Sequence, residues 1–117
     1  MAEAKIEGLP EALAAVRKMV ADVTAAGENA TRDTAEDAAK AMRSRAPSDT
    51  GRLRSRIGVS RTGPGEYAAG VEGVDYAAFV EFGTSKDPAQ PFITPAGESA
   101  RARLTGNVSA AVKRTAR

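Results

Sequence analysis

Apolar residues recur at helical spacing along the first third of the chain. Steps of four, three, four and three positions place one set on a single stripe of a helix: Leu9, Leu13, Val16, Val20 and Val23. The stripe falters at Gly27, resumes mainly as alanines and ends at Pro47. A continuous helix over 9–46 would be about 57 Å long. It therefore either bends near Gly27 and folds over its own sheet, or projects outward, where its stripe needs a partner.

After the turn signal at 48–51, the pattern changes to alternation. Leu53, Ile57 and Val59 share one face of an expected strand, and Arg52, Arg54 and Arg56 share the other. The glycines and proline at 62–65 turn the chain, and alternation continues from Tyr67 to Val71. The pattern predicts a β-hairpin, roughly 53–61 and 66–73, with one apolar face and one basic face.

Two further helices follow the hairpin. Asp75 is expected to cap a short helix, Tyr76 to Phe82, that stops at Gly83. After a polar loop and an extended piece at 91–93, Thr94 and Pro95 favour the start of a last helix, which Gly106 and Asn107 weaken. The predicted fold class is α+β, in a single domain 1–117. Its parts are an N-terminal helical region (1–47), a sheet core that carries the motifs (48–97) and a C-terminal helix (98–117).

Composition indicates a small core. Alanine accounts for 25 of the 49 hydrophobic residues, and large side chains supply most of the free energy of burial. A lone subunit is therefore expected to be marginally stable, and packing against copies of itself is favoured over a weak monomer. Residues 1–50 hold seven basic and nine acidic side chains, against ten and six in 51–117, a division that suits head-to-tail contacts.

Cellular location can be predicted only broadly. The chain has no cysteine, no apolar run of membrane-spanning length and no secretory leader at its N-terminus. We expect it to be made and kept in a cytoplasm, without a membrane partner.

Catalytic motifs are weak. The chain has neither histidine nor cysteine, which removes the commonest general base and the commonest zinc ligands. The triplet Asp49-Thr50-Gly51 spells the aspartic-protease motif, but it follows the polar exit of a helix and not a buried strand. Gly83 to Lys86 lacks the spacing of a phosphate loop. We expect no enzyme activity, catalytic residue, metal or cofactor.

The three alternating arginines, Arg52, Arg54 and Arg56, could contact DNA phosphates, which they would match in spacing. A solvated or inter-subunit basic face is the favoured alternative, because no aromatic residues are interleaved with them.

Three motif segments follow one another between residues 44 and 97. They read APSDTGRL at 46–53, YAAFVEFGT at 76–84 and PAQPFITPA at 88–96. In this order, with a hairpin between the first two, they resemble the head-to-tail joining family of long-tailed, lambdoid-type bacteriophages, which is described as a tail-component family. The resemblance implies a structural virion protein without catalysis, assembled in the host cytoplasm. It implies an oligomeric ring, commonly sixfold, at the head–tail junction, with neck and tail proteins as partners and the genome passing through its hole.

Within those segments, several residues are candidates for a subunit or partner interface: Tyr76, Phe79, Glu81, Phe82, Pro91, Phe92, Ile93 and Pro95. The aromatic side chains of the short helix are expected to anchor the hairpin to the long helix. The apolar 91–93 segment suits either a neighbour's groove or the chain's own sheet. Glu81, a carboxylate at the end of an apolar helix, is expected to pair with a hairpin arginine, within or between subunits.

Overall fold

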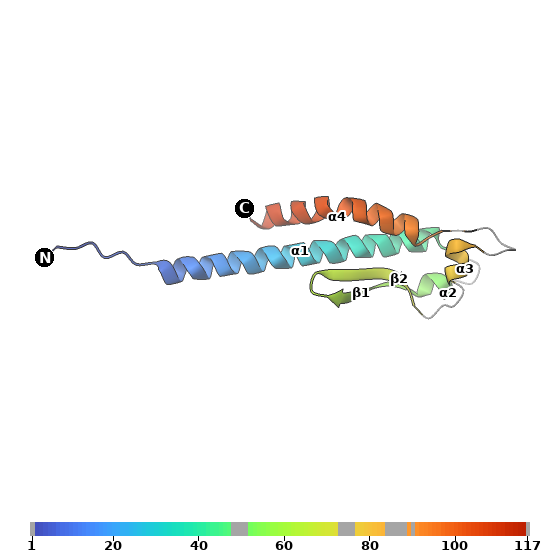
Figure 1. Ribbon diagram of the computed structural model, residues 1–117, viewed down its shortest axis with the longest axis horizontal. Coiled ribbons are helices and arrows are strands. Elements are labelled where there is room, and N and C mark those ends of the chain that lie inside the picture. Colours follow the sequence, from blue (N-terminus) through green and yellow to red (C-terminus); the bar gives the residue numbers. More distant parts are fainter. Residues whose placement is uncertain (1, 48–51, 73–76, 84–88, 90, 117) are drawn as a thin grey trace.

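The molecule is organised along one long helix, as a computed structural model shows (Figure 1). The structure describes residues 2–47, 52–72, 77–83, 89 and 91–116, without the side chains of 52 and 78–80. The elements in chain order are α1 (Leu9–Arg45), α2 (Arg52–Ser55), β1 (Ile57–Gly63), β2 (Glu66–Val71), α3 (Ala77–Phe82) and α4 (Thr94–Thr115). The β-hairpin and α4 pack on different sides of the C-terminal half of α1, and the α+β fold class is confirmed.

Helix α1 runs through Gly27 without a break. Its 37 residues span about 55 Å, and the whole molecule measures 93 × 23 × 20 Å. A Cβ at Gly27 would lie 3.8 Å from Cγ1 of Val108, so the glycine sits where α4 packs closely on α1. The C-terminal half of α1 is covered while its N-terminal half projects (Figure 1). Of the two predicted alternatives, the projecting helix is the one observed.

The hairpin is antiparallel, with Ile57 paired to Val71 and Arg61 paired to Tyr67. Gly65, at a φ of 68°, makes the turn that the sequence predicted. The predicted start of the first strand was wrong, because residues 52–55 form a helical turn. Leu53 is buried in the core, and its carbonyl accepts a hydrogen bond from the N–H of Arg56 at 3.2 Å.

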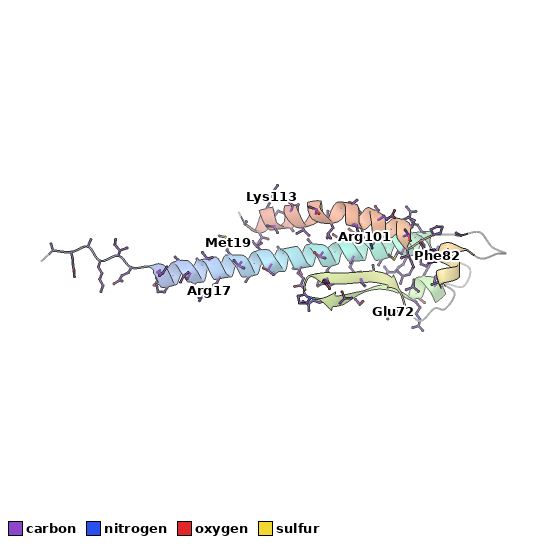
Figure 2. The ribbon with its side chains drawn as sticks, viewed as in Figure 1. Arg17, Met19, Glu72, Phe82, Arg101 and Lys113 are labelled. Carbon is purple, nitrogen blue, oxygen red and sulfur yellow. The ribbon has the colours of Figure 1, made fainter. Side chains whose placement is uncertain are left out.

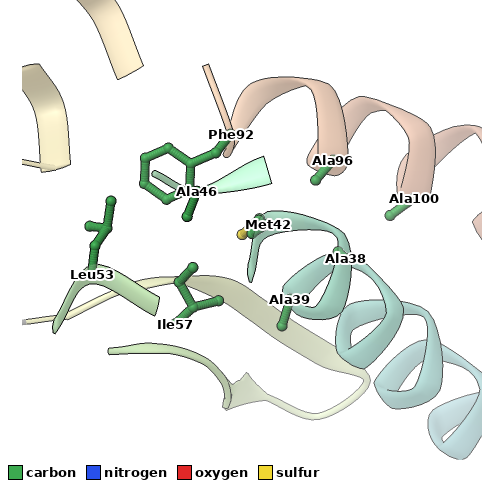
Figure 3. Close-up of a cluster of buried hydrophobic side chains, with 9 residues drawn as sticks. All are labelled: Ala38, Ala39, Met42, Ala46, Leu53, Ile57, Phe92, Ala96 and Ala100. Carbon is green, nitrogen blue, oxygen red and sulfur yellow. The ribbon is translucent and has the colours of Figure 1, made fainter. Parts of the chain in front are cut away.

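A small core joins α1, α2, β1 and α4 (Figure 3). Only Phe92, Met42 and Leu53 among the described residues are large, fully buried side chains. Most of the remaining core is alanine: Ala38, Ala39, Ala46, Ala96 and Ala100. Alanine adds little apolar area but lets helix axes approach closely, which explains how α4 packs along α1 on so few large groups.

Helix α4 is continuous through Gly106 and Asn107. The amide Nδ2 of Asn107 donates a hydrogen bond to Oγ1 of Thr34 at 2.9 Å. Thr34 is buried and its hydroxyl donates in turn to the carbonyl of Ala30 at 2.8 Å. Asn107, which weakens the helix in isolation, thus satisfies a polar group in the α1–α4 contact.

Candidate assembly surface

Glu81 connects the end of α3 to the start of α4. One carboxylate oxygen, Oε1, accepts hydrogen bonds from the backbone N–H groups of Phe92 and Ile93 at 2.9 and 2.8 Å, and Oε2 accepts from Thr94 at 2.9 Å. These groups precede and open α4, where unpaired N–H donors attract negative charge. Glu81 therefore serves as the N-terminal cap of α4 from a distant part of the chain. No ion pair joins Glu81 to a described arginine side chain of the hairpin; because the side chain of Arg52 lies outside the described residues, the pairing stays a prediction.

The ionisation of Glu81 follows from these contacts. Burial alone would raise the pKa of the carboxyl, which is 5% exposed. The backbone N–H donors, together with the Thr94 side chain, outweigh burial and lower the pKa to about 2. Glu81 is consequently a carboxylate at neutral pH, fixed in place and turned away from solvent, which suits a structural tie between α3 and α4.

Phe82 follows Glu81 on α3 and points the other way. Its side chain is 78% exposed, and it lies near the end of the molecule opposite the projecting part of α1 (Figure 2). The expectation that Phe82 anchors the hairpin to the long helix was wrong for this residue. Tyr76 and the side chain of Phe79 lie outside the described residues. Because Glu81 is held by three hydrogen bonds, α3 presents Phe82 to solvent in a defined position.

The segment 91–95 divides between core and surface. Phe92 is fully buried in the chain's own core and Ile93 packs partly against that core, so, of the two predicted alternatives, a neighbour's groove or the chain's own sheet, this segment packs within its own chain. Pro91 is exposed and Pro95 is half-buried in the first turn of α4. Interface roles for these four residues stay predictions; Pro91 is exposed, and Ile93 and Pro95 each keep part of their surface accessible.

The predicted row of arginines does not form. Arg52 and Arg54 belong to the helical turn α2, and Arg56 precedes β1, so the three do not alternate along a strand. The guanidinium of Arg54 donates to the carbonyl of Ala46 through Nη2 at 3.1 Å and Nε at 3.3 Å, closing the end of α1. The side chain of Arg52 lies outside the described part. The expected basic strand face was therefore wrong.

A different arginine connects the hairpin to α1. Nη2 of Arg61 lies 2.7 Å from Oε1 of Glu28, and the Tyr67 hydroxyl donates to the same oxygen at 3.3 Å. The hydrogen bond from Arg61, opposed by partial desolvation, lowers the pKa of the Glu28 carboxyl. The spacing of these residues gave no signal for this contact, because Glu28 and Arg61 are 33 positions apart.

The N-terminal half of α1 carries the predicted apolar stripe into solvent. The exposed fractions are 69% for Leu9, 44% for Leu13, 55% for Val16 and 60% for Val20. Met19, beside the stripe, is also exposed (Figure 2). Scattered exposed apolar residues are ordinary, but a contiguous row of large ones is typical of an interaction surface.

Features of a chemical site are sparse in the described residues. The described acidic side chains include no group of three placed to hold a metal ion. An open groove of about 330 Å³ between α1, β2 and α4 is lined largely by small side chains such as Ala35, Ala38 and Ala69. None of the helices in the described ranges is both long and apolar enough to cross a bilayer.

Together these features define a small α+β protein built on one long helix, with large apolar side chains exposed toward both ends. A family model described as "Bacteriophage HK97-gp10, putative tail-component" matches residues 11–83, from the first turns of α1 to the residue after α3. The chain belongs to this bacteriophage tail-component family, which confirms the resemblance found in its motifs. The first two motif segments lie almost entirely within the matched range and the third lies beyond it. No match was found among curated proteins or among solved structures.

Proposed function

We propose that this chain is a structural, non-enzymatic virion protein that forms a ring at the head–tail junction of a tailed bacteriophage. In this role it acts as a head-to-tail connector, tail-completion or tail-terminator subunit, and the genome passes through the ring. The observation that carries the proposal is the family match over residues 11–83. That range includes most of the projecting part of α1, from residue 11 on, and Phe82.

The arrangement of surfaces supports repeated contacts between subunits. Phe82 lies near one end of an elongated molecule (Figure 2), and the compact body of helices and hairpin lies between it and the projecting helix (Figure 1). Two different patches on one subunit suit a head-to-tail contact, which closes into a ring when the rotation between neighbours is right. The expected ring is sixfold, and its other partners are adjacent neck and tail proteins.

Where the ring contacts the genome, we expect it to recognise no particular base sequence. The described hairpin does not present the row of three arginines that a phosphate-binding strand would need, and Arg54 and Arg61 are engaged within the chain. A nucleic-acid-binding regulator is therefore the weaker alternative. A ring held by apolar contacts should persist in high salt, whereas binding through arginine–phosphate contacts should weaken steeply with salt.

The test is electron microscopy of virions combined with a variant of Phe82. Virions of the phage that encodes the chain should show its density in the neck or at the tail end. Phe82→Ala should leave the thermal unfolding of the chain unchanged, because the side chain is exposed, yet give heads and tails that fail to join. Glu98→Ala, an exposed change on α4, is the control and should give normal particles. Absence of the chain from the neck and tail, or wild-type titre with Phe82→Ala, would contradict the proposal.

A further inference from the structure

The exposed apolar stripe of α1 lies on the same face of the helix as the residues that pack against α4. Steps of alternately three and four residues lead along α1 without interruption: Leu9, Leu13, Val16, Val20, Val23, Gly27, Ala30 and Thr34. The last three of these positions face α4, where Gly27 lies against Val108 and Thr34 accepts a hydrogen bond from Asn107. This spacing is that of a helix–helix seam. One seam therefore runs the length of α1, but α4 fills only its C-terminal half.

Helix α4 ends where the exposed half begins. Its last turn, with Arg114 and Thr115, borders a hollow that Ala26 and Asn29 of α1 also line. Helix α4 runs opposite to α1, and α1 continues well beyond its end (Figure 1). A second helix laid on the exposed half in the direction of α4 would therefore extend the existing antiparallel packing without a new geometry.

The stripe itself matches such a helix. Placed antiparallel, two copies of the segment align in register, with Leu9 level with Val20 of the second copy and Leu13 level with Val16. Every layer of this pairing is then apolar, and each pairs a leucine with a valine. The exposed length is only about two heptads, which is short for an independent coiled coil. Contacts at the end of α4 would add to it.

Charge favours the antiparallel direction. Near the N-terminus, Glu3, Glu7 and Glu11 face a single lysine, Lys5, which pairs with Glu7 at 3.1 Å. In a parallel pair, two such acidic segments would lie side by side. In the antiparallel pair, the acidic segment of one copy reaches the last turn of α4 in the other. Lys113 and Arg114 in that turn make no ion pair with any described residue.

We propose that the free chain forms an antiparallel dimer in which residues 9–20 of α1 pair with the same residues of a second copy. The partner helix takes up the seam where α4 leaves it. The pairing buries the row of leucines and valines before assembly, and it concerns the free chain whether or not the assembled protein is a ring.

The first test is the mass of the full-length chain in solution, measured by sedimentation over a wide range of concentration. The expected result is a reversible dimer. Leu13→Glu should raise its dissociation constant at least about a hundredfold, because it buries an unpaired carboxylate in the seam. Ala15→Glu places the same charge on the outer face of α1 and should leave the dimer intact. A monomer at all concentrations, or a dimer unaffected by Leu13→Glu, would overturn the proposal.

The second test is the direction of pairing, for which the absence of cysteine from the chain is an advantage. In the antiparallel dimer, a chain with Leu9→Cys should form a disulfide with a chain carrying Val20→Cys. Leu9→Cys alone should not cross-link, because its two sulfurs would be separated by about 16 Å along the helices. Cross-linking of Leu9→Cys to itself without the mixed product would indicate a parallel pair and overturn the proposal.

Discussion

Replacing Glu81 with glutamine should weaken the hydrogen bonds that join α3 to the start of α4, and so lower the stability of the chain. The carboxylate accepts three backbone N–H groups, two at Oε1 and one at Oε2. Glutamine can still accept with one oxygen, but its NH2 group would face the N–H of Thr94, so that two donors meet. The change alters no buried volume of note, and its effect therefore reports the hydrogen bonds and the charge.

The expected size of the effect follows from the pKa of Glu81. The value falls from an ordinary 4.5 to about 2, which corresponds to about 3 kcal/mol of stabilisation of the folded state. Hydrogen bonds to charged groups contribute about 1.5–3 kcal/mol each, and glutamine keeps some of them in neutral form. We expect Glu81→Gln to lower the free energy of unfolding at pH 7 by about 2–4 kcal/mol.

The dependence of stability on pH follows from the direction of the pKa shift of Glu81. Because the folded-state pKa is depressed, the contribution of Glu81 is fully present above about pH 4.5 and is lost as the pH falls toward 2. The difference between the wild-type chain and Glu81→Gln should therefore be constant near neutrality, narrow below pH 4.5 and disappear near pH 2.

Urea unfolding monitored by circular dichroism, repeated across this range of pH, measures that difference. Glu98→Gln is the matched control: it removes an exposed carboxylate from α4 and should leave the unfolding free energy nearly unchanged at every pH. Equal stability of wild type and Glu81→Gln at pH 7 would refute the reasoning. A difference that persists undiminished at pH 2 would also refute it, since protonated Glu81 no longer differs from glutamine in charge.

Two further changes test the core and the last helix. Phe92→Ala empties a fully buried site and should lower the unfolding free energy by about 3–5 kcal/mol, whereas Phe82→Ala should change it by less than about 0.5 kcal/mol; equal effects in urea unfolding would contradict the assignment of core and surface. Gly106→Ala meets no atom within 4 Å in the middle of α4 and should raise stability by about 0.5–1 kcal/mol, so a lower melting temperature would show that α4 does not tolerate the side chain.

The periodicity of apolar residues correctly predicted those elements whose pattern fits only one kind of secondary structure. The apolar stripe of α1, the glycine turn of the hairpin, the stop at Gly83 and the last helix all appear as expected. The pattern of residues 52–56 fits both a strand and a helix, because Leu53 and Ile57 are four positions apart. That spacing places them on one face of a strand when Ser55 lies between them, and also on one face of a helix. In the helical turn Leu53 is buried in the same core cluster as Phe92, and the sequence pattern carried no information on that packing.

The sequence indicated which types of residue to examine as site residues, but not which groups those residues contact. The sequence singled out Glu81 as an acidic residue among apolar neighbours, but its three donors lie 11–13 positions later. They are backbone groups, which no side-chain pattern marks. Phe82 was expected to help anchor the hairpin to the long helix, because aromatic residues usually bury their area, and it was also a candidate interface residue. Nothing in six residues of helix indicates which face the rest of the chain leaves open.

The two halves of α1 show why stability and assembly are separable in this protein. Where α1 packs against its own chain it carries small residues such as Ala30, Ala38 and Ala39, which bring helices close but bury little area. Where it projects, it carries Leu9, Leu13 and Val16, whose larger area stays in water. Because the free energy gained on burial grows with apolar area, the larger gain per residue along α1 is available only when another chain covers the projecting half. Substitutions in that half should therefore alter association strongly and the folding of the chain weakly.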